Sequence, residues 1–251
     1  MENPDYKNEI RWLLEEKYDG KRVDGFEKDV ARIKAGEPVD YVIGWTAFLG
    51  CRIDLSGHPL IPRPETEFWA EKAIQDMLGF SGLGLRVLDM FAGSGNIGIA
   101  VLRHVPGAVL AFGEKNKKFC KLIGKNAEQN SVEKKRYRIF CSDMFSEISD
   151  TYDYILANPP YIPKNNIKNV EQSVREWEPH NALFGGEDGL DYIRVFLKEA
   201  KKHLSEKGKI YLEFDVSQKN AVENLAKSLG YRNVSAKRDQ YGKWRYAIIS
   251  L

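Results

Sequence analysis

Residues 85–98 read LRVLDMFAGSGNIG. The apolar run 85–90 is typical of a short buried strand. Gly93 and Gly95 then allow a tight turn, and the pattern of residues 95–104 predicts a helix. In an open α/β sheet, such a junction brings backbone amides close to a bound ligand. This stretch therefore predicts the start of a ligand-binding α/β domain.

Strand and helix patterns alternate through the rest of the chain. The alternation predicts an α/β fold, with a mostly parallel seven-stranded sheet covered by helices on both faces. A closing hairpin around Gly242 would place one antiparallel strand in this sheet. Besides 85–90, the expected strands are 109–113, 138–141, 152–157, 209–214, 233–237 and 244–249, and the expected helices are 115–129, 190–204 and 218–229.

Two short sections precede this domain. Residues 1–36 show helical periodicity, although two such short helices are too small to hold a core alone. Residues 41–43 and 47–55 are β-rich around Gly44 and Gly50, which predicts a hairpin. The predicted boundaries are 1–36 for a helical substrate-docking section, 37–60 for a β-hairpin linker and 61–251 for the main domain.

The main domain opens with Ile61-Pro62-Arg63-Pro64-Glu65-Thr66-Glu67. Pro64 suits the first position of a helix that runs to about residue 78, and the two glutamates complement the positive end of its dipole. A stiff linker before a well-capped helix would explain most of this pattern. Arg63 lies between prolines that hold the segment extended, so it is also a candidate substrate-binding residue.

The composition narrows the class of protein. With 251 residues, 43% hydrophobic residues and a net charge of +2, the chain is typical of soluble proteins, and its charge is too small to indicate a nucleic-acid partner. The N-terminus has no apolar leader and no run reaches membrane-spanning length, so we expect a cytoplasmic protein without membrane contact. Cys51, Cys120 and Cys141 form no CxxC pair and are expected to be free thiols. The four histidines lack metal-ligand spacing, so no metal is expected.

Asn158-Pro159-Pro160-Tyr161 follows the apolar run 154–157 and is the strongest chemical signal in the chain. Prolines donate no backbone hydrogen bond, so the strand ends there and carbonyl oxygens stay free. The Asn158 oxygen and a proline carbonyl can together accept both hydrogens of a planar –NH2 group, with Tyr161 against its flat face. The alternative interpretation is a structural Asn-Pro turn.

The glycine loop is compatible with two ligands. Gly93, Gly95 and Gly98 satisfy the GxGxxG pattern of nicotinamide dinucleotide binders. Glu114 ends the second strand, 21 residues after Gly93, where a carboxylate can accept from both ribose hydroxyls. Asp89 argues against a dinucleotide, because its negative charge would lie close to the negatively charged pyrophosphate. It favours a ligand with an ammonium group, such as the methionine part of S-adenosylmethionine.

Methyl transfer would connect this loop with Asn158. Transfer from a sulfonium is an in-line displacement, and orientation alone can supply ~7–11 kcal/mol when two reactants are well placed. If both N–H groups of the substrate –NH2 donate to Asn158 and a proline carbonyl, these hydrogen bonds favour the positive charge that builds up on the nitrogen during transfer. After the third strand, Asp143 could accept from an adenine amine and Met144 could pack on the ring, although Asp143 also suits a cap or turn.

These motifs together resemble the HemK/PrmC-type release-factor glutamine methyltransferases, which are class I S-adenosylmethionine enzymes of Rossmann-like fold. The resemblance runs from about Pro38 to the C-terminus. It implies N5-methylation of the glutamine amide in the Gly-Gly-Gln motif of a peptide chain release factor. The matching stretches are 38–44, 61–67, the glycine loop, 158–161, 174–180 (VREWEPH) and 182–190 (ALFGGEDGL).

The resemblance also implies roles for individual residues. Glu114 would hold the ribose, and Asp143 with Met144 would hold the adenine. Asn158 would bridge cofactor and substrate, and Pro159, Pro160 and Tyr161 would hold the glutamine. The methionine part would be held by the loop Phe91, Ala92, Gly93, Ser94 and Gly95.

The chain departs from the family at two places. Phe91 occupies the position of the first glycine of the family's loop, and residues 1–36 are about half as long as its N-terminal helical domain.

Three other classes of function are compatible with parts of the sequence. A nucleic-acid amino-methyltransferase would use the same pocket on an adenine or guanine amine, with the basic residues between 115 and 138 as a binding face. A nicotinamide oxidoreductase would need a proton relay, and no Tyr-x-x-x-Lys set stands out. A module that only binds S-adenosylmethionine would have no use for residues 158–161. We expect a monomer whose partner is a release factor.

Overall fold

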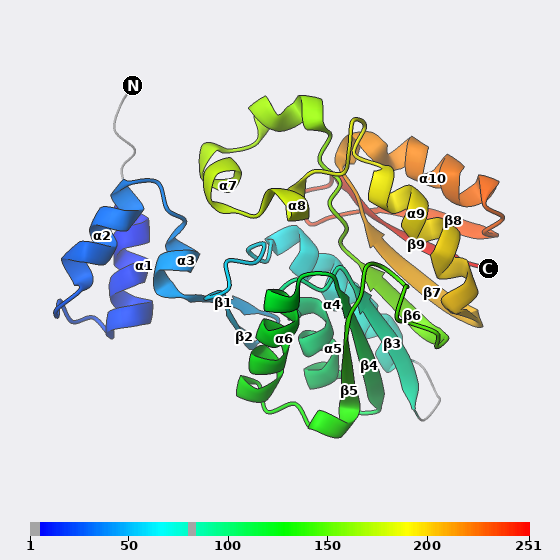
Figure 1. Ribbon diagram of the computed structural model, residues 1–251, viewed down its shortest axis with the longest axis horizontal. Coiled ribbons are helices and arrows are strands. Elements are labelled where there is room, and N and C mark those ends of the chain that lie inside the picture. The colour runs from blue at the N-terminus through cyan, green and yellow to red at the C-terminus, as the bar shows by residue number, and fades with distance from the viewer. Residues whose placement is uncertain (1–5, 80–83) are drawn as a thin grey trace.

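A seven-stranded sheet forms the centre of the molecule in the computed structural model, which describes residues 6–79 and 84–251 (Figure 1). The strand order is β5-β4-β3-β6-β7-β9-β8, and β9 runs antiparallel to both of its neighbours. The predicted α/β class and the single antiparallel strand are therefore confirmed. The strands are β3 (Leu85–Met90), β4 (Ala108–Glu114), β5 (Tyr137–Cys141), β6 (Tyr152–Ala157), β7 (Leu204–Glu213), β8 (Asn233–Arg238) and β9 (Trp244–Ser250).

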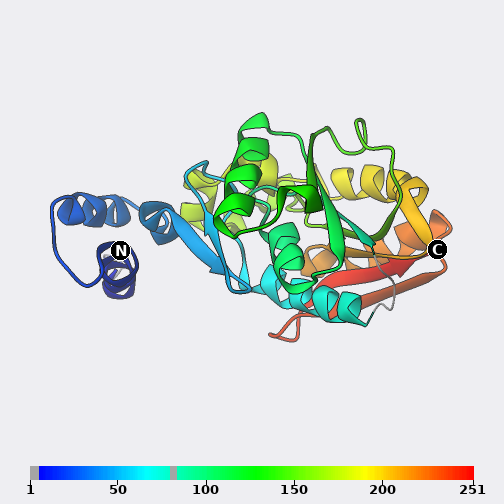
Figure 2. The ribbon, with the colours of Figure 1, turned by 90° about the horizontal axis from the view of Figure 1, so that it is seen from below.

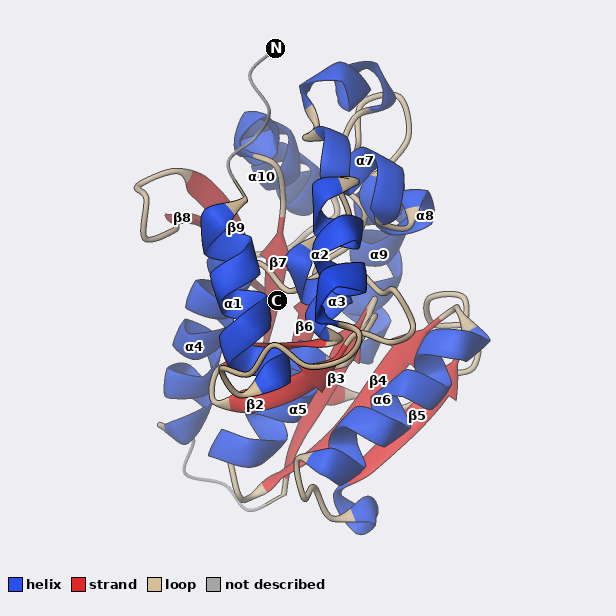
Figure 3. Ribbon diagram, turned by 90° about the vertical axis from the view of Figure 1, so that its left-hand side faces the viewer, coloured by secondary structure: helices blue, strands red, loops and turns tan. Residues whose placement is uncertain are grey.

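Helices cover both faces of this sheet, and each face has its own hydrophobic core (Figure 3). Successive side chains of a strand point to opposite faces, so Val87 belongs to one core and Leu88 to the other. Burial on both faces explains why the parallel strands read as almost continuous apolar runs. One face carries α4 (Pro64–Leu78), α5 (Asn96–His104) and α6 (Lys117–Gln129), and the other carries α9 (Asp191–Ala200) and α10 (Lys219–Ser228).

Gly98 brings α5 directly against β4. A Cβ atom built on Gly98 would overlap the ring of Phe112 and would lie 2.9 Å from a methyl carbon of Leu110. The third glycine of the GxGxxG pattern is thus explained by helix-to-strand packing and does not require a dinucleotide.

Two predicted elements of the main domain differ from their expected bounds by more than two residues. One segment also has structure that the sequence patterns miss. The helix expected over 190–204 ends at Ala200, and β7 begins at Leu204 because this residue pairs with Tyr152 of β6. No element was expected between β6 and residue 190. This stretch contains η2 (Lys164–Asn169), α7 (Gln172–Trp177) and α8 (His180–Leu183), and the other short 3-10 helices are η1 (Lys134–Arg136), η3 (Lys201–His203) and η4 (Val216–Gln218).

The N-terminal section projects from the main domain (Figure 2). It consists of α1 (Lys7–Tyr18), α2 (Phe26–Lys34) and α3 (Val39–Ile43), and the first five residues of the predicted section 1–36 lie outside the described residues. Leu13, Phe26 and Val42 belong to a hydrophobic cluster shared by these three helices. As expected, the two helices of residues 1–36 do not form a core alone, because α3, which lies outside residues 1–36, supplies the third wall.

The predicted hairpin is correct only in its second half. Residues 41–43 were expected in a strand, but they belong to α3, which is capped by Gly44 with a φ of 95°. The apolar triplet 41–43 is ambiguous between strand and helix, and here Tyr41 and Val42 are both buried by neighbouring segments. The hairpin itself pairs β1 (Trp45–Phe48) with β2 (Cys51–Asp54).

The cysteines also differ from expectation. Cys120 of α6 and Cys141 at the end of β5 form a disulfide with a Cα–Cα distance of 6.0 Å, whereas Cys51 is free and buried. The two partners are 21 residues apart in sequence. Only the packing of α6 against β5 brings them together, so their spacing in the sequence carried no signal.

We predict that Gly98→Ala destabilises the protein. The added methyl group would overpack the α5–β4 contact at a cost of about 1–3 kcal/mol. This cost should outweigh the ~1 kcal/mol by which alanine is favoured over glycine within a helix. Urea unfolding followed by circular dichroism should show a lower midpoint. The control is Gly107→Ala, in the turn between the same two elements, where an added Cβ meets no atom within 4 Å. Equal midpoints for the two variants would contradict the packing argument.

Candidate active site

Four parallel strands end at one edge of the sheet and carry the predicted site residues. Met90, the last residue of β3, pairs with Gly113 of β4 on one side and with Ala157 of β6 on the other. Phe91 therefore begins the glycine loop between Glu114 and Asn158. The chain order reverses between β3 and β6, and ligands of open α/β sheets bind beyond the strand ends at such a point.

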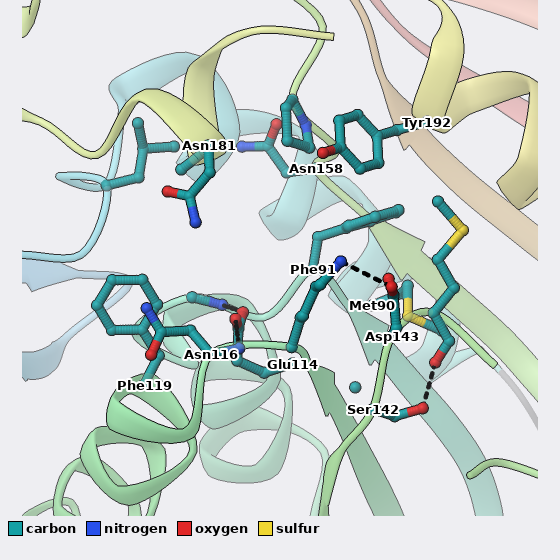
Figure 4. A pocket seen from close by; sticks show the side chains of 17 residues that line it. Met90, Phe91, Glu114, Asn116, Phe119, Ser142, Asp143, Asn158, Asn181 and Tyr192 are labelled. Atoms are coloured by element: carbon teal, nitrogen blue, oxygen red, sulfur yellow. Dashed lines mark hydrogen bonds and ion pairs between the residues drawn. The ribbon is translucent and has the colours of Figure 1, made fainter. Parts of the chain in front are cut away.

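A cavity of about 310 Å³ opens at this edge, at the lower end of the size range of small-molecule sites. Figure 4 shows Asn158, Asn181 and Tyr192 along one side of it and Glu114, Asn116 and Phe119 along another. The lining residues are Leu60, Met90, Phe91, Gly93, Gly113, Glu114, Lys115, Asn116, Phe119, Ser142, Asp143, Met144, Asn158, Pro160, Asn181, Ala182 and Tyr192.

A second, small cavity of about 30 Å³ adjoins the first. Phe91, Gly93 and Asn158 line both cavities. The predicted residues Arg63, Ala92 and Ser94 line only the small one, together with Thr66. Four of the predicted site residues, all within the described part of the chain, line neither cavity: Asp89, Gly95, Pro159 and Tyr161. Their predicted roles therefore rest on other contacts.

Glu114 joins the end of β4 to the glycine loop. Its two carboxylate oxygens accept from the backbone N–H groups of Gly93 at 2.8 Å and Asn116 at 2.7 Å. Burial raises the pKa of this carboxyl, and these hydrogen bonds oppose the rise. A carboxylate offers about four lone-pair sites, so two remain for hydroxyl groups of a ligand.

Asp89 lies beneath the loop and is fully buried. Its Oδ2 accepts from the Gly98 N–H at 2.9 Å, and its Oδ1 has no hydrogen-bond partner within the described parts of the chain. Burial raises the pKa of Asp89 to about 8, and the negative charge of Glu114 adds to this rise. An unpaired buried carboxylate oxygen is costly, so the site would gain from a cation or a proton placed there.

Phe91 adopts a left-handed backbone conformation with a φ of 61°. This conformation explains why a glycine suits the position, and it costs roughly 1–2 kcal/mol for a residue with a Cβ. The Phe91 ring packs against Tyr192 and Phe196 of α9, at centroid distances of 6.2 and 5.8 Å. Aromatic packing on α9 therefore offsets the strain and turns the loop into a wall of the cavity.

The adenine side of the predicted site is more exposed. Asp143 accepts from Lys115 Nζ at 2.7 Å, and both side chains are exposed. The Ser142 hydroxyl donates to the Met144 carbonyl at 2.7 Å, and Met144 has a φ of 51°. Positive φ values at non-glycine residues gather at functional sites, and two of them border this cavity.

Arg63 links two stretches that are far apart in the sequence. Its guanidinium donates to Glu178 Oε1 at 2.5 Å, and the other oxygen of Glu178 accepts from the Ile61 N–H at 3.2 Å. Glu178 is buried, which raises the pKa of its carboxyl, and Arg63 opposes that rise. The pair fixes residues 61–67 against residues 174–180.

The glycines of Phe184-Gly185-Gly186-Glu187-Asp188-Gly189 allow this segment to touch the backbone of Pro160 and Tyr161. A Cβ on Gly185 would overlap the Pro160 carbonyl oxygen, and a Cβ on Gly189 would overlap the Tyr161 carbonyl oxygen. Glycine is required because two backbones approach each other there. Gln218 also donates to the Tyr161 carbonyl at 2.8 Å.

Several cavity residues escaped the sequence analysis. Asn116 is the N-cap of α6 and accepts from the Lys118 N–H at 2.9 Å, a role that its place after Glu114 could have indicated. Phe119 and Tyr192 lie on predicted helices, and nothing in the patterns distinguishes them from core or surface residues. Asn181 belongs to α8, in the stretch where no element was expected.

Two features are absent from the described residues, 6–79 and 84–251. Within these ranges, no three or more His, Cys, Asp or Glu side chains gather in a way that could hold a metal ion. In the same part of the chain, no helix combines the length and apolar character needed to cross a membrane.

Comparisons with known proteins relate the chain to methyltransferases. The family model "Methyltransferase small domain" matches residues 74–176. The chain is 33% identical to the release factor glutamine methyltransferase of Thermodesulfovibrio yellowstonii, over 85% of this chain and 76% of the relative. It is 35% identical to the protein of the same name from Streptococcus pneumoniae, over 89% and 79% of the two chains. The corresponding protein of Lactococcus lactis is 31% identical, over 95% and 87%.

Solved structures agree with the fold. A methyltransferase from Pyrococcus furiosus has a TM-score of 0.60 at 20% identity and covers 89% of this chain and 97% of its own. The 16S rRNA N2 G1207 methyltransferase of Thermus thermophilus, solved with AdoMet and guanosine, has a TM-score of 0.58 at 17% identity, over 82% and 49% of the two chains. At these identities the likeness concerns the fold alone.

We predict that Asp89 makes the stability of the ligand-free protein depend on pH. The folded carboxyl keeps its proton up to about pH 8, whereas the unfolded one releases it near its ordinary value of 3.8. The folded state therefore binds more protons, and the free energy of unfolding falls as pH rises from about 4 to about 8. Asp89→Asn cannot ionise and should flatten this slope in urea titrations at several pH values. The exposed carboxyl variant Asp24→Asn serves as the control, and parallel slopes for Asp89→Asn and the unmodified protein would refute the expectation.

Proposed function

The chain belongs to the release factor glutamine methyltransferases, and we propose that the edge formed by β4, β3 and β6 carries its S-adenosylmethionine-dependent reaction. The substrate in this proposal is the side-chain amide of a glutamine in the Gly-Gly-Gln motif of a peptide chain release factor, which is methylated at N5. One observation carries the assignment of residues. The pairing of Met90 with Ala157 puts the start of the glycine loop beside Asn158.

The residues around the larger cavity fit S-adenosylmethionine. Glu114 has carboxylate lone pairs left for the ribose hydroxyls after binding the N–H groups of Gly93 and Asn116. Met144 and Phe91 offer apolar surface, and Asp143 can accept from the adenine amine. The orphaned Oδ1 of Asp89 suits a positively charged group near the loop, although Asp89 lies behind the cavity wall.

When bound, S-adenosylmethionine supplies a methyl group on a positively charged sulfur. The chain contributes orientation. The Asn158 oxygen and a carbonyl of Pro159 or Pro160 accept the two amide hydrogens, which turns the nitrogen towards the methyl carbon. These acceptors would also favour the positive charge that the nitrogen gains as the new N–C bond forms and the sulfur–methyl bond breaks, with neutral S-adenosylhomocysteine as the leaving group. The amide then loses one proton to water, so no strong general base is needed.

Tyr161 is proposed to lie beside the substrate glutamine, and two hydrogen bonds hold Tyr161 in place. Its hydroxyl donates to Glu213 at 2.9 Å, and Gln218 holds its carbonyl. Burial together with the charge of Glu213 raises the pKa of Tyr161 well above its ordinary value, so it stays neutral.

The N-terminal section is proposed to dock the release factor. A groove of about 650 Å³ lies between this section and α7. Its walls include the acidic residues Glu9, Asp40, Glu171 and Glu176, which would suit a basic segment of the partner. Arg63 lines both this groove and the small cavity beside Asn158, so a docked segment would lead towards the site.

The basic residues of the nucleic-acid alternative are spread over both ends of the parallel strands, and Lys115, which lines the cavity, is paired with Asp143. The basic residues 134–136 form η1 at the start of β5, whereas the cavity lies beyond the other end of that strand. The Arg136 guanidinium is occupied by the carbonyls of Leu102, Val105 and Ala108. Lys125 of α6 is paired with Asp54 at 2.7 Å.

The function is tested with labelled S-adenosylmethionine and three substrates in parallel. We expect label in the release factor, none in its variant with Ala in place of the Gly-Gly-Gln glutamine, and none in ribosomal RNA. Label in RNA with an unlabelled release factor would replace the proposal by the nucleic-acid alternative.

We predict that Asn158→Ala lowers kcat by about 10²–10³-fold, the usual effect of removing one oriented polar group from an active site. The Kd for S-adenosylmethionine, measured by calorimetry, should change little. Asn233→Ala, which removes an exposed asparagine of β8, is the control. Turnover by Asn158→Ala equal to that of this control would refute the assignment.

We predict that Glu114→Ala weakens binding of S-adenosylmethionine at least about tenfold. Hydrogen bonds to a charged acceptor contribute about 1.5–3 kcal/mol each, and 1.4 kcal/mol corresponds to a factor of ten. Calorimetric titration measures the loss, with the exposed α6 variant Glu128→Ala for comparison. An unchanged Kd for Glu114→Ala would exclude the ribose role.

A further inference from the structure

Glu213 is a buried carboxylate that the proposed mechanism does not use. It is the last residue of β7, and only 1% of it is exposed. Its Oε2 accepts from the Thr66 hydroxyl at 2.7 Å and from Trp69 Nε1 at 2.6 Å, and its Oε1 accepts from the Tyr161 hydroxyl at 2.9 Å. Three donors thus converge on one carboxylate directly behind the Asn-Pro-Pro-Tyr segment.

Thr66 connects this carboxylate to Asn158. The Asn158 Nδ2 donates to the Thr66 oxygen at 3.3 Å, and both residues line the small cavity. A hydroxyl has a single hydrogen. Glu213 accepts that hydrogen from Thr66, so the Thr66 oxygen can only accept from its other neighbour.

This arrangement fixes which way the Asn158 amide is turned. An oxygen that can only accept must face the –NH2 end of the amide, because facing Oδ1 would bring two acceptors together. Oδ1 is then left on the side away from Thr66. The same carboxylate fixes the Tyr161 hydroxyl, so one buried group restrains both Asn158 and Tyr161.

We propose that Glu213 and Thr66 are positioning residues for methyl transfer, which orient the Asn158 oxygen towards the acceptor nitrogen and hold Tyr161 in place. This inference rests on the proposed role of Asn158. A purely structural role for Glu213, which also anchors the fully buried Trp69, would predict loss of stability without a specific loss of turnover.

The decisive comparison is Thr66→Val with Thr66→Ser. Valine keeps the shape of threonine but lacks the hydroxyl, so Asn158 loses the acceptor that orients it, and we expect kcat to fall on the order of 10²-fold. The Kd for S-adenosylmethionine should stay close to that of the unmodified enzyme. The unfolding midpoint should fall, because the buried Glu213 loses one of its three donors, so kcat is compared at a temperature where both enzymes are folded. Thr66→Ser keeps the hydroxyl and should recover most of the lost turnover.

Tyr211→Phe is the matched control. It removes a buried hydroxyl from the same strand, β7, where Tyr211 donates to Asp76 of the same helix, α4, at 2.9 Å. This bond has no path to Asn158 through the hydrogen bonds described above. A Thr66→Val enzyme with the kcat of Tyr211→Phe would overturn the proposal, and so would a Thr66→Ser enzyme as inactive as Thr66→Val.

Glu213→Gln tests the carboxylate itself. A glutamine at this position keeps one oxygen acceptor and replaces the other with an –NH2 donor. It cannot accept from Thr66, Trp69 and Tyr161 together, so Thr66 or Tyr161 loses its partner. If both residues act through one chain of bonds, Glu213→Gln combined with Thr66→Val should lower kcat less than the product of the single effects. Independent, multiplicative effects would contradict a common path.

A second readout separates this inference from the proposed function. The NMR signals of the Asn158 side-chain –NH2 group, assigned by their loss in Asn158→Ala, should shift in Thr66→Val and stay in place in Tyr211→Phe. This measurement needs no substrate. Unmoved signals in Thr66→Val would overturn the inference even in an active enzyme, whereas an unmodified enzyme that never methylates the release factor would overturn only the proposed function.

Discussion

The parallel pairing of β3 with β6 is the constraint on which the site depends. Met90 lies opposite Ala157 in this pairing and opposite Gly113 in the pairing with β4. Parallel strands direct their carboxyl ends to one edge, so the three loops that follow these strands begin side by side. A register shift of two residues would move Asn158 by about 6–7 Å, given the rise of 3.3 Å per residue in parallel strands. Such a displacement would separate Asn158 from the glycine loop, and the proposed methyl transfer would then lack an acceptor that orients the nitrogen.

Buried carboxylates hold the loops at this edge. Asp89 binds the N–H of Gly98, Glu114 binds that of Gly93, Glu178 binds Arg63, and Glu213 binds Thr66, Trp69 and Tyr161. A buried carboxylate is tolerated only when donors surround it. Each of these carboxylates therefore stabilises the loop conformation in which hydrogen-bond donors reach it. Asp89 is the exception, because one of its oxygens has no partner among the described residues, and it lies next to the proposed cofactor loop.

Close backbone contacts complete the site and explain its sequence motifs. Gly185 and Gly189 touch the carbonyls of Pro160 and Tyr161, where any side chain would collide with the main chain. Phe91 shows the opposite solution, since it keeps a side chain in a left-handed conformation and packs its ring on α9. Gly185 and Gly189 thus hold their loop close to the strand ends by lacking a side chain. Phe91 holds its own loop there by packing its ring on α9.

The sequence by itself determined the fold class and identified the glycine loop, Glu114 and the Asn-Pro-Pro-Tyr segment as candidates for the site. These features are readable because hydrophobic periodicity and turn chemistry depend on residues that are near neighbours in the chain. Tertiary structure alone decided that residues 41–43 form a helix, that Cys120 meets Cys141, and that Asn181 and Tyr192 line the cavity. It also decided that Glu213 lies behind Asn158, 55 positions away in the sequence. These contacts join segments separated by whole helices and strands. Their energies depend on packing and burial in three dimensions, which leave no periodic trace in the order of the residues.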